Sequence, residues 1–275
     1  MTTALRPLST GELLDRTFSL YRSHFGLFVG IFALPYLVVL AYRCVGLVFQ
    51  SPSPQLSNMV VSLLWNLGAL FLIVIVSAAS QAATVVAVSN LHLDRPASVM
   101  DSFAAVKVHI LGVLGLSMIV SMAAGMACLF LIVPGVLLFI MWSLAVPAKV
   151  LEHKGVFDSM SRSMELTKGG RGRIFVIGLL VVVLALAVSW LLQWPVLIAA
   201  GFSLKSGIQR LTIGWQVAML ISEFVSRSLV GALSTIALSL VYYDQRVRKE
   251  AFDLQLMMST IDATAMSGSP AQVGA

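Results

Sequence analysis

Six long stretches with almost no charged residues constrain this chain more than any other feature. A hydrocarbon layer about 30 Å thick is crossed by about 20 apolar helical residues. Hydrophobic residues make up 59% of the chain and charged residues 11%, with a mean hydropathy of +0.95, which lies outside the range of soluble domains. We therefore predict an all-α polytopic membrane bundle of six transmembrane helices. The stretches cover residues 26–48, 59–88, 109–133, 136–151, 174–199 and 214–243.

The fourth stretch is the shortest and contains Pro147. Three arrangements fit it: a tilted span, a segment embedded among its neighbours, or a hairpin with the third stretch through Pro134-Gly135. Its complete crossing of the membrane is the least constrained part of the predicted topology.

A short polar helix start occurs three times, each time before an amphipathic segment and two apolar stretches. Ser9, Ser98 and Gly155 stand at capping positions, and each has an acidic residue three positions later that can reach back to free backbone N–H groups. This order predicts a threefold internal repeat of one amphipathic helix plus two spans. The units are residues 6–90, 95–151 and 154–243.

The amphipathic segments are predicted to lie at the membrane surface. In the first, Leu14, Phe18 and Tyr21 recur at helical spacing on one face, while Asp15 and Arg22 lie elsewhere on the helix. Such a helix can hold lipid headgroups in the plane of the interface, or it can be a connector that orients the following spans. Both interpretations stay open at this point.

Lysine and arginine are distributed unevenly between the two sides of the predicted bundle. Because basic residues near span ends are retained in the cytoplasm, the richer side is predicted to be cytoplasmic and to carry both termini, as in a bacterial-type inner (plasma) membrane. The poorer side has only Lys205 and Arg210. The richer side has Arg6, Arg16, Arg22, Arg95, Lys107, Lys149, Lys154, Arg162, Lys168, Arg171, Arg173, Arg246, Arg248 and Lys249.

The formal net charge of +6 does not indicate nucleic-acid binding, because the basic residues flank apolar spans and form no stripe with exposed aromatic residues. The same charges fit the anionic lipids of the inner leaflet. Membrane lipids are therefore the predicted partners, with no nucleic acid among them.

Three charged residues fall inside the predicted spans and form the candidate site. Glu223 and Arg227 are one helical turn apart in the last span, and Arg43 lies near the outer end of the first, within reach of Glu223. A structural ion pair is the simpler interpretation. The alternative is a polar pocket in the outer half of the bundle, where one acid and two bases leave a net positive site for an anionic headgroup or solute.

Ser77, Gln81 and Thr84 share one face of the second span with several alanines. Small and hydroxyl residues let membrane helices pack closely, so helix packing is the preferred interpretation. A path for a solute is the alternative.

Signatures of catalysis are missing from the sequence. His24, His92, His109 and His153 all lie near the predicted cytoplasmic boundary, without the spacing of a zinc site. No phosphate-binding glycine loop or serine nucleophile motif is found. We expect no enzyme activity, no catalytic residues, no cofactor and no metal.

Three segments resemble the membrane-domain family named after glycerophosphoryl diester phosphodiesterase. They are Arg6-Pro7-Leu8-Ser9-Thr10-Gly11-Glu12-Leu13-Leu14-Asp15-Arg16-Thr17-Phe18, the stretch from Trp142 through Glu152 to Ser163, and Tyr242-Tyr243-Asp244-Gln245-Arg246-Val247-Arg248-Lys249-Glu250. Some relatives join this membrane region to a phosphodiesterase barrel that begins with His-Arg-Gly. This chain has neither that tripeptide nor the length for the barrel, so the resemblance implies the membrane part and no hydrolysis. It departs from the family at Gly169, Gly170 and Gly172, where relatives tend to carry an aromatic residue.

One membrane domain is predicted over residues 1–259, in which the last span is followed by a cytoplasmic helix to residue 259, and a disordered tail over residues 260–275. The expected function is that of a non-enzymatic membrane scaffold or lipid-interacting module. The alternative is a small-solute or lipid transporter, which a cavity reaching Arg43, Glu223 or Arg227 would favour and a tightly packed bundle would disfavour. A membrane-embedded enzyme of lipid metabolism is disfavoured, because Glu223 is the one acid deep in a span.

Overall fold

The computed structural model describes residues 8–49, 56–205 and 213–267, and the regular structure of these ranges is entirely helical. The predicted all-α class is confirmed. Two of the basic residues counted above, Arg6 and Arg210, lie outside the described residues. The helices are α1 (Thr10–Ser23), α2 (Phe25–Phe49), α3 (Leu56–His92), α4 (Val99–Lys107), α5 (Ile110–Phe130), α6 (Ile132–Trp142), α7 (Ala145–Glu152), α8 (Val156–Thr167), α9 (Arg171–Lys205) and α10 (Ile213–Ser267).

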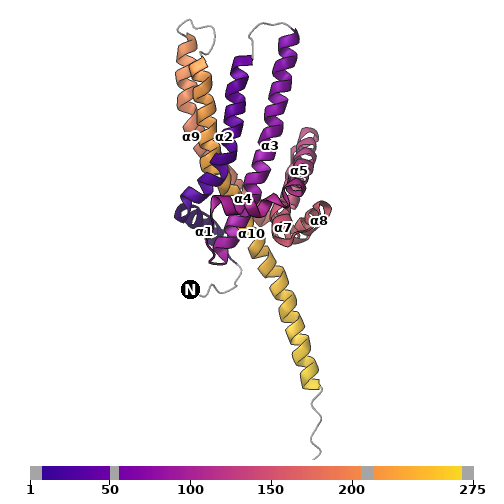
Figure 1. Ribbon diagram of the computed structural model, residues 1–275. Coiled ribbons are helices and arrows are strands. Elements are labelled where there is room, and N and C mark those ends of the chain that lie inside the picture. Colours follow the sequence, from indigo (N-terminus) through magenta and orange to yellow (C-terminus); the bar gives the residue numbers. More distant parts are fainter. Residues whose placement is uncertain (1–7, 50–55, 206–212, 268–275) are drawn as a thin grey trace, which may run out of the picture.

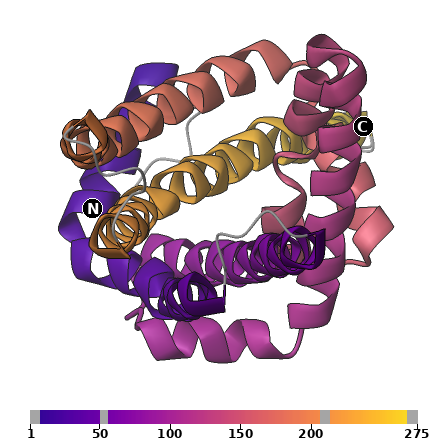
Figure 2. The same cartoon turned by 90° about the horizontal axis from the view of Figure 1, so that it is seen from above.

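Six helical segments are long and apolar enough to cross a membrane, which confirms the predicted number. They are Phe25–Leu47, Leu56–His92, Ile110–Phe130, Val133–Glu152, Arg171–Ala199 and Ile213–Glu250. The last of them is the most buried, because α10 passes through the middle of the bundle with α9 on one side and α3 on the other (Figures 1 and 2). α1 precedes α2 and α3, α4 precedes α5 and α6, and α8 precedes α9 and α10. The internal repeat stays a prediction, since this order does not compare the three units with one another.

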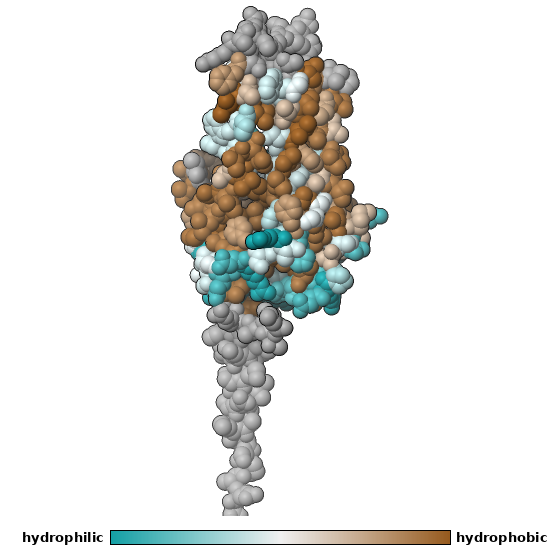
Figure 3. Space-filling view, turned by 90° about the vertical axis from the view of Figure 1, so that its left-hand side faces the viewer, coloured by the Kyte–Doolittle hydropathy of each residue, from teal (hydrophilic) through white to brown (hydrophobic). Residues whose placement is uncertain are grey.

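The short helices α1, α4, α7 and α8 lie together at one end of the bundle, which is called the basic end from here on (Figure 1). In the face shown in Figure 3, hydrophilic residues form a band at this end, and the surface above the band is largely hydrophobic. The opposite end, where α2 and α9 end and α3 and α10 begin, is called the far end.

The predicted capping residues are the N-caps of α1, α4 and α8. The capping box is complete only in α1, where Ser9 Oγ accepts the Glu12 N–H at 3.2 Å and Glu12 Oε2 accepts the Ser9 N–H at 2.7 Å. In α4 the acid is not used in this way, because Asp101 Oδ2 accepts the Ser98 hydroxyl at 2.5 Å. Gly155 offers α8 no side-chain cap.

The fourth predicted span is not one continuous helix. It is divided into α6 and α7, which break at Ser143 and Leu144. Pro147 lies in the first turn of α7, where its missing N–H costs no helical hydrogen bond, so the helix restarts just before it. Ser163 of α8 fills the break, accepting the Leu144 N–H at 3.2 Å and donating to the Met141 carbonyl at 2.7 Å.

One further boundary differs from the prediction. α10 continues past residue 243 as predicted, but it also extends beyond residue 259, so part of the segment expected to be disordered is helical. Residues 268–275, the rest of that segment, lie outside the described residues. α5 reaches less far toward the far end than α2 and α3 do, since its upper end lies well below theirs in Figure 1.

Small and hydroxyl residues allow close helix packing in the core. A Cβ at Gly231 of α10 would lie 2.3 Å from the ring of Phe32 in α2, so these helices approach where only glycine fits. Ser77 Oγ lies 2.7 Å from Tyr36 Oη, and Ser80 donates to the Ile31 carbonyl of α2 at 3.2 Å. These contacts support the packing interpretation of the second span, whereas Thr84 donates within its own helix.

Candidate functional site

The three charged residues predicted from the sequence lie together at one place between α2 and α10. Arg43 Nη1 donates to Glu223 Oε2 at 2.8 Å, and Arg227 Nη2 lies 3.9 Å from Glu223 Oε1. The side chains of Arg43 and Glu223 are 32% and 33% exposed, and that of Arg227 is 53% exposed. This set of residues is called the far-end cluster. Two guanidinium groups and one carboxylate give it one net positive charge.

The far-end cluster lies well away from the basic end along α10. At 1.5 Å per residue, about 30 Å of helix separates Glu223 from Tyr243 at the basic end. Pairing at 2.8 Å and 3.9 Å compensates part of the cost of placing three charges within apolar helices.

A groove of about 410 Å³ opens beside the far-end cluster, and α9 and α10 line it. Its polar lining consists of Ser189, Gln193, Glu223, Ser226, Arg227 and Ser234. Ser226 donates to Ser189 Oγ at 2.7 Å and Ser222 donates to the Leu192 carbonyl at 3.0 Å, which ties the two helices together along the groove. On the side of α2, a second space beside the cluster is only about 20 Å³, which is enough for one water molecule.

Ser189 and Gln193 did not emerge from the sequence as site residues. Their spacing of four places both on one face of a helix, and this was the available signal. It was weak, because single polar residues are ordinary in membrane helices that pack against one another. The partner surface on α10 cannot be read from the spacing.

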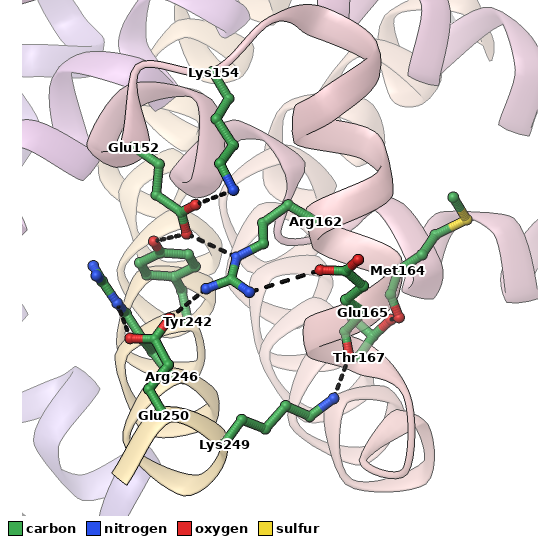
Figure 4. Close-up of polar contacts among 10 residues, drawn as sticks. All are labelled: Glu152, Lys154, Arg162, Met164, Glu165, Thr167, Tyr242, Arg246, Lys249 and Glu250. Carbon is green, nitrogen blue, oxygen red and sulfur yellow. Dashed lines mark hydrogen bonds and ion pairs between the residues drawn. The ribbon is translucent and has the colours of Figure 1, made fainter. Parts of the chain in front are cut away.

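A second group of charged residues lies at the basic end and joins α7, α8 and α10 (Figure 4). Glu152 is its centre: it accepts from Lys154 at 2.7 Å, from Arg162 at 3.1 Å and from the Tyr242 hydroxyl at 2.6 Å. The side chain of Glu152 is only 11% exposed. Three donors therefore compensate a carboxylate that has lost most of its water.

Arg162 extends these contacts to the carboxylates of Glu250 and Glu165. Burial alone would lower the pKa of the Arg162 guanidinium, but its hydrogen bonds to Glu152 and Glu250 outweigh burial and raise that pKa. Arg246 also pairs with Glu250, at 2.5 Å, and Lys249 donates to the Glu165 carbonyl. The residues of these two paragraphs are called the basic-end network.

Asp244 joins the beginning of the described chain to α10. Its side chain is fully buried, and it accepts the Leu8 N–H at 2.8 Å, Arg173 Nη1 at 2.5 Å and Arg248 Nε at 2.9 Å. Arg173 and Arg248 also donate to the Leu8 carbonyl. The motif around Asp244 was part of the family resemblance, but no sequence pattern connects it to Leu8.

The histidines do not form a ligand cluster among the described residues. His92 stacks on Tyr243, and His109 lies beside His153 with ring centres 4.9 Å apart. In the part of the chain that the structure describes, no group of three or more His, Cys, Asp or Glu side chains is placed to hold a metal ion.

The two charged regions differ in what they can do chemically. Each carboxylate of the basic-end network contacts a cation, and the network ties three helices together. The far-end cluster has an excess cation beside an open groove, so it can accept an anion. In comparisons with known proteins, no family model, no curated protein and no solved structure matches this chain.

Proposed function

We propose that this protein is a non-enzymatic lipid-interacting module or scaffold of a bacterial-type inner membrane, which binds an anionic lipid headgroup at the far-end cluster. One observation carries the proposal: Arg227, half exposed, lies beside a groove of about 410 Å³ and belongs to a cluster with one net positive charge. Guanidinium groups match the geometry of phosphate oxygens, and a phosphodiester would supply the missing negative charge.

The orientation proposed from the sequence agrees with this assignment. With the basic end in the cytoplasm, the far-end cluster faces the outer leaflet, while α1, α4 and α8 lie where anionic lipids of the inner leaflet attract lysine and arginine. The threefold repeat and the resemblance to the phosphodiesterase membrane domain are part of the same proposal. They support a membrane module without hydrolytic activity.

Native mass spectrometry of protein in phosphatidylglycerol and phosphatidylethanolamine nanodiscs tests the headgroup site. We expect one retained phosphatidylglycerol per protein, and an occupancy at least five-fold lower for Arg227→Gln. Arg22→Gln is the matched control, because Arg22 is exposed at the basic end, far from the groove. Equal retention by all three proteins would show that the far-end cluster is not a lipid site.

A transporter of a lipid or small anionic solute is the second candidate. The groove that reaches Glu223 and Arg227 supports this candidate. Proteoliposomes with labelled phosphatidylglycerol distinguish the two functions. If the protein is a transporter, the wild type moves the labelled lipid between leaflets faster than the Arg227→Gln variant does. A binding module retains the lipid and leaves the rate of exchange at that of protein-free vesicles.

A further inference from the structure

A second cavity lies along α9, nearer to the basic end than the groove beside Arg227. It measures about 150 Å³ between α6 and α9, and its lining is almost entirely apolar. Val136 and Phe139 of α6, Gly178 of α9 and Leu238 of α10 are among the residues that line it.

The apolar cavity and the polar groove lie next to each other along α9 and share one lining residue, Val182. On α9, Gly178, Val182, Ser189 and Gln193 follow one another at spacings of four, seven and four, so they share one face of the helix.

The facing surface of α10 has the same pattern. Glu223, Arg227, Ser234 and Leu238 are again spaced by four, seven and four. Each helix therefore offers a stripe that is polar toward the far end and apolar toward the basic end. Between Glu223 and Leu238 this path is about 22 Å long.

We infer that this path holds one anionic glycerophospholipid of the far-side leaflet, with its phosphate at Arg227 and one acyl chain running past Val182 to Gly178. The inference rests on the proposed headgroup site and adds the position of an acyl chain. From Arg227 to Leu238 the path is about 16 Å long, close to the ~15 Å of hydrocarbon in one leaflet. Charge and polarity match along that length, since the path is cationic toward the far end and apolar toward the basic end.

The chain contact distinguishes a whole lipid from a free anion. An acyl chain in the apolar cavity tethers the phosphate next to Arg227 and so raises its effective concentration there. Inorganic phosphate has no such tether. We expect phosphatidylglycerol to bind at least ten-fold more tightly than inorganic phosphate.

Gly178→Leu tests the acyl-chain part without touching the far-end cluster. Gly178 lines the cavity and a Cβ there meets no other atom within 4 Å, so the position accepts the start of a side chain, and leucine also favours the helix. Gly125→Leu is the matched control, because Gly125 of α5 is equally open and lies away from the path. In native mass spectrometry we expect phosphatidylglycerol occupancy to fall at least five-fold in Gly178→Leu and to stay at the wild-type level in Gly125→Leu.

The outcomes separate this inference from the proposed function. If Arg227→Gln loses the lipid but Gly178→Leu keeps it, only the headgroup is bound and the inference is wrong. If neither variant loses it, the proposed function is wrong as well. Should Gly178→Leu fail to fold, wild-type protein is irradiated with phosphatidylglycerol that carries a diazirine at the chain end. Crosslinks on α6, on α9 near Gly178 or on α10 near Leu238 support the inference, and crosslinks confined to other positions overturn it.

Discussion

Charged side chains gather at two levels of α10, and their surroundings differ. At the basic end, Asp244 is fully buried and Glu152 nearly so, and each accepts from three donors. At the far end, Glu223 and its two arginines are a third to a half exposed. Buried and fully paired charges fix helices in place, whereas exposed and unbalanced charges remain available to a ligand.

Asp244→Ala should show the largest effect on stability. The substitution leaves Arg173, Arg248 and the Leu8 N–H without their common acceptor, and loss of one partner of a buried ion pair costs about 3–5 kcal/mol. The free energy of unfolding in detergent micelles measures this effect. Glu223→Ala is the far-end counterpart, with an expected loss of at most about 1 kcal/mol. Equal losses would remove the contrast between the two regions.

Two tyrosines provide the next comparison. Tyr242 donates to the Glu152 carboxylate at 2.6 Å, whereas Tyr42 near the far end donates to the neutral Trp65 carbonyl at 3.2 Å. Hydrogen bonds to charged groups contribute about 1.5–3 kcal/mol and neutral ones about 0.5–1.5 kcal/mol. Tyr242→Phe should therefore lower the unfolding free energy more than Tyr42→Phe does, in the same denaturant titration. The reverse order would contradict the assignment of Glu152 as the centre of the network.

Arg43→Gln should change stability least. It removes an exposed ion pair, for which about 0–1 kcal/mol is expected. Glu223 is then left with Arg227, so the net charge of the cluster falls from one to zero and phosphatidylglycerol occupancy should fall with it. Thermal unfolding and native mass spectrometry on the same sample give both values. A large loss of stability with unchanged lipid occupancy would make the far-end cluster a structural ion pair.

Much of this architecture follows from local sequence rules. The capping positions Ser9, Ser98 and Gly155 were predictable, because a cap is decided by residues within one helical turn. The approach of Arg43 to Glu223 was also predictable, since charged residues inside apolar spans usually pair with an opposite charge at the same depth.

The remaining features depend on contacts between distant segments. The helix break at Leu144 is stabilised by Ser163 of another helix, which no local pattern reveals. The groove beside Arg227 arises from the spacing between α9 and α10, and sequence periodicity gives the face of each helix but not the distance between two faces. The length of α10 was underestimated, because composition in its last turns resembles that of a flexible tail.

The contact between Leu8 and Asp244 has a consequence for biosynthesis. The backbone at the start of α1 is held by side chains of α9 and α10, which are the last helices to be made. These contacts can therefore form only after every intervening helix has been made, so the two ends of the described chain are joined last.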